Sequence, residues 1–207
     1  MGTCTLCEAG KYKGFPGGAE CVSCPPHSHT WVANGDTSVP DTFTVGNDDV
    51  SDCLCNIGFS GTVTGNAEDC TACPAGQFKA LVGTSACVAC PSDSNTWHFA
   101  TTGLTATTGN VAAYQCMCDK GHYGVIEGTS SVSGGTCENC PTGQYKADVG
   151  TERCIACPAN SDAPTESDAA SDCSCNAGFE GYIHGDDRTV GQCNKCPTGK
   201  YKNLYEA

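Results

Sequence analysis

Apolar positions are scattered along the chain, and they do not follow the period of a helix. Instead, one short pattern recurs four times: a glycine, a variable residue, an aromatic ring and a lysine. The pattern predicts a turn at the glycine, followed by a short strand that carries the ring. Because little else is apolar, we expect each ring to cover a disulfide and each lysine to lie in solvent. The rings are those of Tyr12, Phe78, Tyr145 and Tyr201, and the lysines are Lys13, Lys79, Lys146 and Lys202.

A second pattern places an aromatic ring between two glycines, in segments 58–61, 121–124 and 178–181. The glycines allow a tight hairpin at each segment. In the second segment the aromatic Tyr123 stands one position later than the rings of the others, so we expect that hairpin to differ in detail.

Two long segments, 31–52 and 97–115, are rich in Thr, Ser, Gly and Asp. They exceed the roughly 12–15 residues usual for structureless connections. We expect them to form hairpins of their own or to dock onto a neighbouring chain. Trp31 and Trp97 stand at their starts and are our candidates for anchoring residues and for contacts with partners.

Composition indicates that covalent links replace an ordinary core. The chain has 20 Cys and 26 Gly among 207 residues, which is the cysteine density of a disulfide scaffold. Leu, Ile, Val and Phe together number only 28, below the roughly 20% that accompanies a normal apolar core. We therefore expect a small, disulfide-rich fold of short strands and loops.

The cysteines form three six-cysteine units that start 66 and then 67 residues apart, which indicates a modular array. We expect modules at 7–70, 73–137 and 140–193, and the start of a further module at 196–207. Cys4 and Cys196 remain, and we interpret them as parts of modules that lie before and after this segment. The cysteines of the three units are Cys7, Cys21, Cys24, Cys53, Cys55 and Cys70; Cys73, Cys87, Cys90, Cys116, Cys118 and Cys137; and Cys140, Cys154, Cys157, Cys173, Cys175 and Cys193.

The gaps between cysteines are of two kinds. Thirteen residues always separate the first and second cysteines, two separate the second and third, and one separates the fourth and fifth. The gap between the third and fourth cysteines varies as 28, 25 and 15 residues. Fixed gaps indicate geometry that the fold requires, whereas variable gaps indicate surface loops, in which insertions cost little.

Charge and hydropathy exclude several classes of partner. The net charge is −13, and the ten Lys and Arg do not cluster, so we expect no binding to nucleic acid. No apolar run approaches the ~20 residues of a membrane span, so we expect no membrane insertion in this segment. No signal peptide precedes Cys4. If the protein is extracellular, we therefore expect this chain to be a fragment or mature segment of a longer precursor.

Zinc is the alternative use of these cysteines. The segments 4–24, 70–90 and 137–157 each have the spacing of a four-cysteine zinc site. A zinc site, however, leaves the C-x-C pairs and the glycine–aromatic–glycine segments without a role. We interpret the pair His27 and His29 as incidental. No catalytic triad, phosphate-binding loop or paired-carboxylate motif is present, so we expect no enzyme activity, metal or cofactor.

The full pattern C-P-x-G-x-[YF]-K…C-x-x-C-P-x-x-S-x-T…C-x-C-x-x-G-[FY] resembles the ephrin-receptor-like cysteine-rich repeat. Its closing part is similar to the second half of an EGF-like module, and its opening part is similar to the first half of a TNF-receptor module. The resemblance implies an elongated, extracellular, all-β tandem array of EGF-like modules without catalysis. The copies that carry it include Cys73 to Pro91 and Cys140 to Pro158.

The EGF-like resemblance implies that the first cysteine pairs with the third, the second with the fourth and the fifth with the sixth. The TNF-receptor half-module implies instead that the first pairs with the second and the third with the fourth. Both schemes contain the fifth-to-sixth bond. The EGF-like pairs would be Cys7–Cys24, Cys21–Cys53, Cys55–Cys70, Cys73–Cys90, Cys87–Cys116, Cys118–Cys137, Cys140–Cys157, Cys154–Cys173 and Cys175–Cys193.

These observations predict an extracellular or cell-surface structural repeat: a rigid spacer, or a building block of a coat or fibre. Its variable loops would bind other copies of the chain or other extracellular proteins. The joints between modules contain only two residues, at 71–72, 138–139 and 194–195, so we expect them to be stiff. A second interpretation is a ligand-binding or adhesive receptor segment, and a remote third is a zinc-binding protein.

Overall fold

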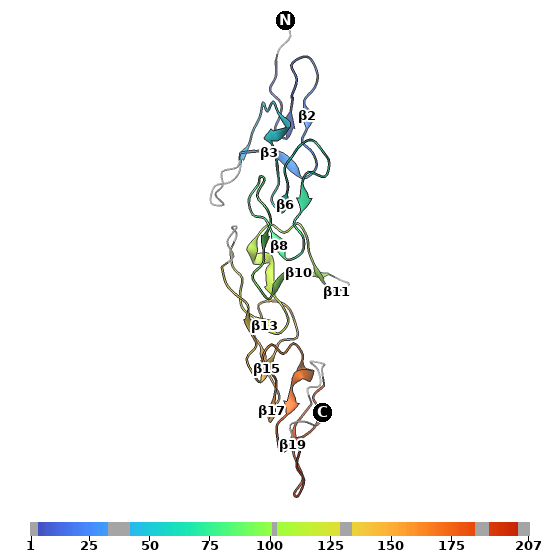
Figure 1. Cartoon of the computed structure of the whole chain (residues 1–207), viewed down its shortest axis with the longest axis vertical. Helices are drawn as coiled ribbons and strands as arrows, with labels where there is room; N and C mark the ends of the chain where they lie inside the picture. Colours follow the sequence, from blue (N-terminus) through green and yellow to red (C-terminus); the bar gives the residue numbers. More distant parts are fainter. Residues whose placement is uncertain (1–3, 33–41, 101–102, 129–133, 185–190, 203–207) are drawn as a thin grey trace. The chain divides into compact units, whose positions relative to one another are not determined.

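The computed structural model describes residues 4–32, 42–100, 103–128, 134–184 and 191–202 (Figure 1). The chain divides into two compact units. Unit 1 comprises Met1–Cys90, Asn95–Cys116 and Glu127–Gly134, and unit 2 comprises Pro91–Ser94, Met117–Ile126 and Gly135–Ala207. Below, the segments 7–70, 73–137 and 140–193 are called modules 1, 2 and 3 as labels for the cysteine pattern.

Regular structure in the described residues is limited to short antiparallel strands and three single-turn 3₁₀ helices. The predicted fold class, small, disulfide-rich, all-β and loop-rich, is therefore confirmed. The strands lie in seven two-stranded and two three-stranded sheets. The strands of module 1 and its joint are β1 (Lys11–Tyr12), β2 (Val22–Ser23), β3 (Ser28–Val32), β4 (Thr42–Phe43), β5 (Cys53–Cys55), β6 (Phe59–Ser60) and β7 (Thr71–Ala72).

The same order of elements returns in module 2, and it returns in module 3 without a counterpart of β4 and β11. Module 2 has β8 (Gln77–Phe78), β9 (Val88–Ala89), β10 (Ser94–Ala100), β11 (Gly103–Ala106), β12 (Cys116–Cys118), β13 (His122–Tyr123) and β14 (Glu138–Asn139). Module 3 has β15 (Gln144–Tyr145), β16 (Ile155–Ala156), β17 (Ser161–Asp162), β18 (Ser174–Cys175), β19 (Phe179–Glu180) and β20 (Asn194–Lys195).

The three 3₁₀ helices lie just before the C-x-C strands. The N-terminus of each helix is capped by the side chain of the last residue of the same helix. They are η1 (Val50–Asp52), η2 (Ala113–Gln115) and η3 (Ala170–Asp172). In η1 the carboxylate of Asp52 accepts hydrogen bonds from the N–H groups of Asp48 and Asp49, each 3.1 Å long. The side chains of Gln115 and Asp172 do the same in the other two. Such capping satisfies amide groups that a short helix leaves unpaired.

Both long segments after the third cysteine contain a hairpin, as predicted. In module 1, Trp31 in β3 lies opposite Phe43 in β4. In module 2, β10 pairs with β11, and Trp97 lies opposite Ala106. Module 3 has the shortest gap at this point, and β17 pairs only with β18. The extra length therefore adds a hairpin to an otherwise constant module.

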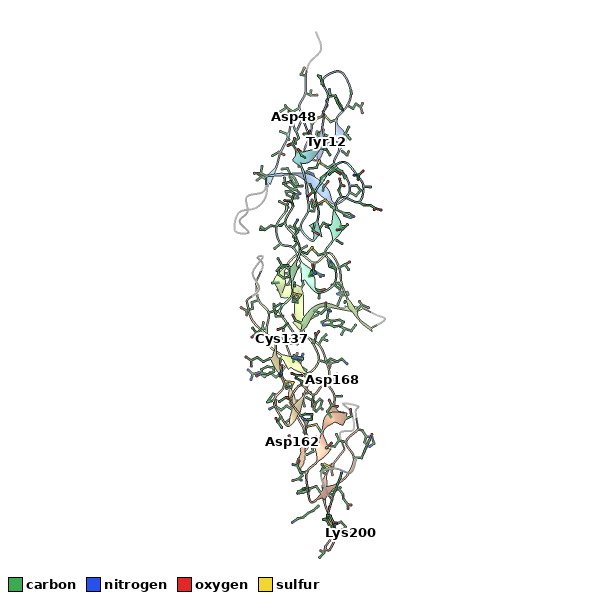
Figure 2. All side chains as sticks on the ribbon, viewed as in Figure 1. Tyr12, Asp48, Cys137, Asp162, Asp168 and Lys200 are labelled. Carbon is green, nitrogen blue, oxygen red and sulfur yellow. A yellow bond between two sulfur atoms is a disulfide. The ribbon has the colours of Figure 1, made fainter. Side chains whose placement is uncertain are left out.

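Eighteen cysteines form nine disulfides within the described chain (Figure 2). The EGF-like pairing expected for the first four cysteines of each module is wrong: the first bonds to the second and the third to the fourth. The fifth-to-sixth bonds are present in all three modules. The observed pairs are Cys7–Cys21, Cys24–Cys53, Cys55–Cys70, Cys73–Cys87, Cys90–Cys116, Cys118–Cys137, Cys140–Cys154, Cys157–Cys173 and Cys175–Cys193.

Strand geometry accounts for the separate partners of the second and third cysteines. Side chains alternate between the two faces of an extended strand, so cysteines three positions apart point to opposite sides. Cys21 and Cys24 flank β2 in this way. Cys21 bonds back to Cys7 across the β1–β2 hairpin, and Cys24 bonds to Cys53 at the start of β5. The Cα–Cα distances of both bonds are 5.8 Å, within the usual range.

Disulfides and single rings form the small cores, as predicted for so few apolar residues. In unit 1, Tyr12 and Phe59 pack against buried Cys53, Cys55 and Cys70. In unit 2, a second cluster gathers around a ring and two disulfide bonds; it contains Tyr145, Ala163, Ala170, Cys173, Cys175, Ile183 and Cys193. None of the helices that the structure describes is long and apolar enough to cross a membrane.

Candidate functional site: the joints between modules

The two residues between consecutive modules are not a free linker, because they form a strand with the preceding module. At the first joint, β7 pairs with β6, and Phe59 lies opposite Ala72. At the second joint, β14 pairs with β13, and His122 lies opposite Asn139. At the third, β20 pairs with β19 in the same register. The closing hairpin of module 2 therefore has the same strand register as the others, whereas its side-chain contacts differ, as with the bond from the Tyr123 hydroxyl to Glu138.

Backbone hydrogen bonds extend the first joint beyond this strand pair. The N–H of Gly58 donates to the carbonyl oxygen of Lys79, and the N–H of Cys73 donates to the carbonyl oxygen of Gly58, both at 2.8 Å. The N–H of Gly83 donates to the carbonyl oxygen of Cys55 at 2.9 Å. Three hydrogen bonds thus connect the closing segment of module 1 to the opening turn of module 2, and all lie inside unit 1.

The second joint repeats the same three bonds inside unit 2. Gly121 donates to Lys146 at 3.0 Å, Cys140 donates to Gly121 at 2.8 Å, and Gly150 donates to Cys118 at 2.8 Å. A recurrence at equivalent positions, with different side chains around them, indicates that the joint is a property of the repeat.

Glycine is required at the centre of each of these two joints. Gly58 has φ of +77°, and a Cβ there would overlap the carbonyl oxygen of Gly109. Gly121 has φ of +74°, and a Cβ there would overlap the carbonyl oxygen of Glu166. The left-handed backbone favours glycine by itself, and the close approach of another backbone leaves no room for a side chain.

The sequence pattern predicted that the side chain of Lys79 lies in solvent, and that prediction is wrong. It is only 2% exposed. Its ammonium nitrogen donates to the carbonyl oxygen of Phe59 in module 1 at 2.7 Å and to that of Gly83 in module 2 at 2.8 Å. Burial lowers the pKa of Lys79 from 10.5 to about 8. The lysine therefore connects the two modules through backbone carbonyl groups.

Lys146 holds the equivalent place at the second joint and is also 2% exposed. Its Nζ lies 3.3 Å from the carbonyl oxygen of Asp119 and 3.5 Å from that of Cys118. Burial lowers its pKa, and the nearby carboxylates of Asp119, Asp148 and Glu152 oppose that shift. The expectation of a solvated lysine is therefore wrong for module 3 as well.

In modules 1 and 2, a buried threonine supports the opening turn, which carries Lys79 in module 2. In module 2, the N–H of Gly76 donates to Oγ1 of Thr96 at 2.9 Å, and that hydroxyl donates to the carbonyl oxygen of Thr107 at 2.8 Å. Thr30 makes the same two contacts in module 1. In module 3, Ala163 stands at this position, and Gly143 donates to its carbonyl oxygen instead, at 2.8 Å.

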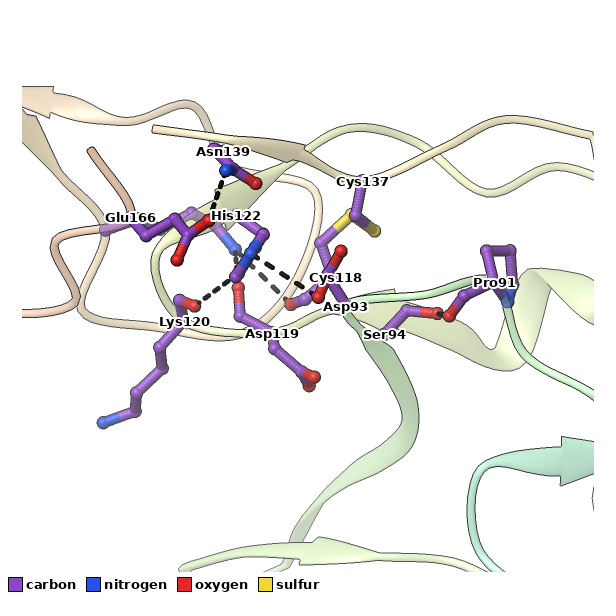
Figure 3. A network of polar contacts seen from close by, with 11 residues as sticks. Pro91, Asp93, Ser94, Cys118, Asp119, Lys120, His122, Cys137, Asn139 and Glu166 are labelled. Carbon is purple, nitrogen blue, oxygen red and sulfur yellow. Dashed lines mark hydrogen bonds and ion pairs between the residues drawn. A yellow bond between two sulfur atoms is a disulfide. The ribbon is translucent and has the colours of Figure 1, made fainter. Parts of the chain in front are cut away.

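One contact beside the joint changes chemistry between modules while its place stays constant. In module 1, the rings of His27 and Phe59 stack at 4.1 Å with an interplanar angle of 8°. In module 2 the same two positions hold Asp93 and His122, whose carboxylate oxygen and Nε2 lie 3.7 Å apart (Figure 3). His27 and Asp93 share an unusual left-handed backbone, with φ of +61° and +59°.

Figure 3 also shows a side-chain contact across the second joint. The side-chain amide of Asn139, in the joint strand β14, donates to the carboxylate of Glu166 in module 3. The N–H of Asp119 donates to the carbonyl oxygen of Asp93 at 2.9 Å. The first contact joins β14 to module 3, and the second joins the turn before β10 to the closing hairpin of module 2.

The two tryptophans predicted as contact residues lie in separate hairpins. Trp31 is half-buried, and its indole N–H donates to Oδ1 of Asn56 at 2.8 Å. Its ring lies 4.5 Å from that of Phe43, and the ring of His29 lies 4.3 Å from Phe43. Trp97 is also half-buried. Trp31 thus belongs to an aromatic cluster of His29, Trp31 and Phe43, of which Phe43 is exposed.

The cysteine segments with zinc-like spacing do not form metal sites. For example, Cys70, Cys73, Cys87 and Cys90 belong to three different disulfides. His27 stacks on Phe59, whereas His29 packs against Phe43 at an interplanar angle of 50°, so the two imidazoles contact different rings. Within the described ranges, no three His, Cys, Asp or Glu side chains are grouped as metal ligands. Cys4 and Cys196 are free thiols.

Sequence reasoning missed the joint as a site, although the signal was visible. A lysine six positions after the first cysteine recurs in every copy of the opening pattern. The pattern alone could not show that the acceptors lie in the previous module, because backbone carbonyl groups leave no trace in a sequence.

The fold and its joints define a class: tandem, disulfide-bonded, cysteine-rich repeat proteins. Residues 61–116 and 128–174 match the family described as tyrosine-protein kinase ephrin type A/B receptor-like. The chain is therefore a tandem array of cysteine-rich repeats, and just under half of its length is similar to the ephrin-receptor-like family. Because disulfides of this density persist in oxidising environments, these repeats are extracellular or displayed at a cell surface.

Relatives include proteins of very different overall build. Cysteine repeat modular protein A of Toxoplasma gondii is 29% identical over 99% of this chain and 7% of that protein. A mouse protein with sushi, von Willebrand factor type A, EGF and pentraxin domains is 27% identical over 75% of this chain and 4% of its own length. Ephrin type-B receptor 2 of Coturnix japonica is 40% identical over 31% of this chain and 6% of the receptor. The chain thus spans only a small part of each.

Proposed function

We propose that the chain is an extracellular structural spacer that holds its modules at fixed angles through its joints. The observation that supports this proposal best is the repeated joint, in which three backbone hydrogen bonds and a buried lysine recur at equivalent positions. No residue between Cys70 and Cys73 is left without a strand partner. Bending at such a joint would break several hydrogen bonds at once.

Distance measurements across the first joint test the spacer proposal. Spin labels carried by unnatural amino acids at Glu20 and Ser85, both exposed, would leave the disulfides intact. We expect a single narrow distance distribution in double electron–electron resonance. A variant with three glycines inserted between Ala72 and Cys73 is the control and should give a broad distribution. An equally broad distribution in the unaltered chain would contradict the proposal.

The spacer proposal includes the absence of catalysis. Two of the relatives above are a receptor and a cysteine-repeat protein, and the geometry that recurs in this chain lies in joints made of backbone groups and a buried lysine. Such joints position modules and present no reactive side chain to a substrate.

Contact with other extracellular proteins, or with further copies of this chain, is a second proposed role, carried by the hairpins. The observation that favours it is the aromatic cluster of His29, Trp31 and Phe43, beside which Val32 and Val45 are also exposed. Trp97 would serve the same role on β10. Aromatic side chains are enriched at the centres of protein interfaces.

Sedimentation equilibrium tests the contact role by comparing Trp31→Ala, Trp97→Ala and Tyr182→Ala with the unaltered chain. Tyr182 is exposed and lies in module 3, outside both hairpins, so its replacement is the control. If the hairpins mediate self-association, only the tryptophan variants should shift toward monomer. A chain that stays monomeric at all concentrations would restrict this role to other partners.

A further inference from the structure

Module 1 leaves open the surface that a preceding module covers in modules 2 and 3. Lys79 and Lys146 are each 2% exposed, whereas the equivalent Lys13 is only half-buried. The rings behave alike: Phe78 and Tyr145 are buried, but Tyr12 is half-buried. This difference arises within an otherwise equivalent opening turn.

The hydrogen-bonding groups of this open surface are already in place. In module 2, the N–H of Cys73, the carbonyl of Lys79 and the N–H of Gly83 bond to module 1. The equivalent groups of module 1 have no backbone partner among the described residues; they are the N–H of Cys7, the carbonyl of Lys13 and the N–H of Gly17.

Lys13 is also positioned as Lys79 is. Its Nζ donates to the carbonyl oxygen of Gly17, the equivalent of the bond from Lys79 to Gly83. The second acceptor of Lys79 belongs to the preceding module, and Lys13 has no counterpart to it in the described part of the chain. A hollow of about 620 Å³ lies here, lined by Cys4, Leu6, Lys13, Gly17 and Cys21 among others.

From this geometry we infer that the face formed by Cys4, Leu6, Cys7, Lys13 and Gly17 is a docking site for the closing hairpin of another repeat of the same class, joined to this chain at Cys4. The inference deepens the proposed spacer function and rests on it. Cys4 stands three residues before Cys7, as Cys70 stands three residues before Cys73. The incoming hairpin would supply the carbonyl groups that module 1 supplies to module 2.

A second copy of this chain is a poorer occupant, because the glycine of each of its closing hairpins already makes a backbone hydrogen bond to the segment that follows. Gly58 and Gly121 bond to the next module in the same chain. The carbonyl oxygen of Gly178 accepts from the N–H of Cys196 at 2.9 Å. Docking in trans would have to displace one of these contacts, whereas a repeat in the same polypeptide brings a free hairpin.

The test is an extended chain in which a copy of residues 7–69 replaces residues 1–3 directly before Cys4. Refolding with glutathione disulfide lets the copied fifth cysteine and Cys4 bond, as two thiols lose their hydrogens and one glutathione disulfide becomes two glutathiones. The matched control carries Gly58→Ala in the copy alone, which would place a Cβ against the backbone of the docking face. A second extension uses a copy of residues 140–192, in case the first does not fold.

The readouts are the rate of acylation of Lys13 by an acetyl N-hydroxysuccinimide ester, followed by peptide mass spectrometry, and the hydrogen exchange of the Cys7 and Gly17 amides. We expect both to slow by about tenfold or more in the extended chain, equivalent to about 1.4 kcal/mol of opening free energy. The Gly58→Ala control should show a smaller effect.

Three outcomes would overturn the inference. One is an unchanged Lys13 rate in either extended chain whose copied disulfides are mapped as formed. Another is a Lys13 rate in the unextended chain that falls with protein concentration, which would assign the face to a second copy. The last is equal protection in the Gly58→Ala control. Protected Lys13 combined with a broad spin-label distance distribution would instead contradict the spacer function and leave the docking face standing.

Discussion

The ammonium nitrogen of Lys79 in module 2 lies 2.7 Å from the carbonyl oxygen of Phe59 in module 1. The same nitrogen lies 2.8 Å from the carbonyl oxygen of Gly83, so one side chain is bonded on both sides of the joint. Hydrogen bonds that involve a charged group contribute more to stability than neutral ones. The joint therefore depends on this lysine more than its place in a loop would indicate.

Replacing Lys79 with Met should loosen the first joint. Methionine keeps much of the apolar stem but leaves two carbonyl oxygens without a donor, which costs about 1–3 kcal/mol for each buried group. We expect faster hydrogen exchange at the amides of Gly58 and Gly83, with the disulfides intact. Lys13→Met is the control, since Lys13 is half-buried. This substitution should change the exchange of the Gly58 and Gly83 amides by much less. Equal effects of the two substitutions would contradict a special role for Lys79.

Stability should rise with pH between about 8 and 10.5 because of Lys79. Its pKa is about 8 when folded and 10.5 when exposed, so within that window the unfolded chain binds more protons than the folded chain. Protons then favour unfolding, and removing them favours the folded state. Denaturant unfolding at several pH values would measure the rise, after the thiols of Cys4 and Cys196 have been alkylated to prevent exchange. Lys79→Met should show a smaller rise.

Replacing Gly121 with Ala should disrupt the second joint. Its Cβ would meet the carbonyl oxygen of Glu166, and the left-handed backbone adds strain, so a loss of about 1–3 kcal/mol is expected. Gly178→Ala is a matched control: it has φ of +84°, but nothing lies within 4 Å of its Cβ position. Thermal unfolding of both variants separates the effect of backbone strain from that of the steric clash with Glu166. An equal loss of stability in Gly178→Ala would attribute the effect to backbone strain alone.

Replacing Thr96 with Val should weaken the opening turn of module 2. Valine has nearly the same shape but can neither accept from Gly76 nor donate to Thr107. Leaving these two groups unpaired in a buried place should cost about 2–4 kcal/mol. Thr96→Ser keeps the hydroxyl and should recover most of the loss, as measured by denaturant unfolding. A serine variant as unstable as the valine variant would point to lost packing of the methyl group instead.

Sequence patterns predicted the repeated elements well, because the constraints on them are local. The gap of thirteen residues between Cys73 and Cys87 fixes a hairpin, and the glycines around Phe59 fix a turn. The disulfide partners of the first four cysteines could not be read, since resemblance to two families implied two pairings. The bonds Cys7–Cys21 and Cys24–Cys53 decide between them, and these become known only with the structure.

The joints were harder to predict than the modules, because their contacts are long-range and made by backbone atoms. The sequence shows that a lysine recurs at Lys79 and Lys146, but charge and composition favour an exposed position for any lysine. For Lys79, one carbonyl group that compensates for its burial is that of Phe59, which lies 20 residues earlier and across a module boundary. The contact roles of Trp31 and Trp97 stay predictions, because each ring is half-buried within its own hairpin.

Because the joints use carbonyl and amide groups that every residue carries, a repeat does not have to recognise the side chains of its neighbour. A repeat that keeps its cysteines, the lysine equivalent to Lys79 and the glycines equivalent to Gly58 and Gly83 can follow any other repeat that keeps them. Duplication, loss or reordering of whole repeats would therefore preserve the joint, while the loop between the third and fourth cysteines remains free to diverge. The length of such an array can change during evolution without any need to redesign its connections.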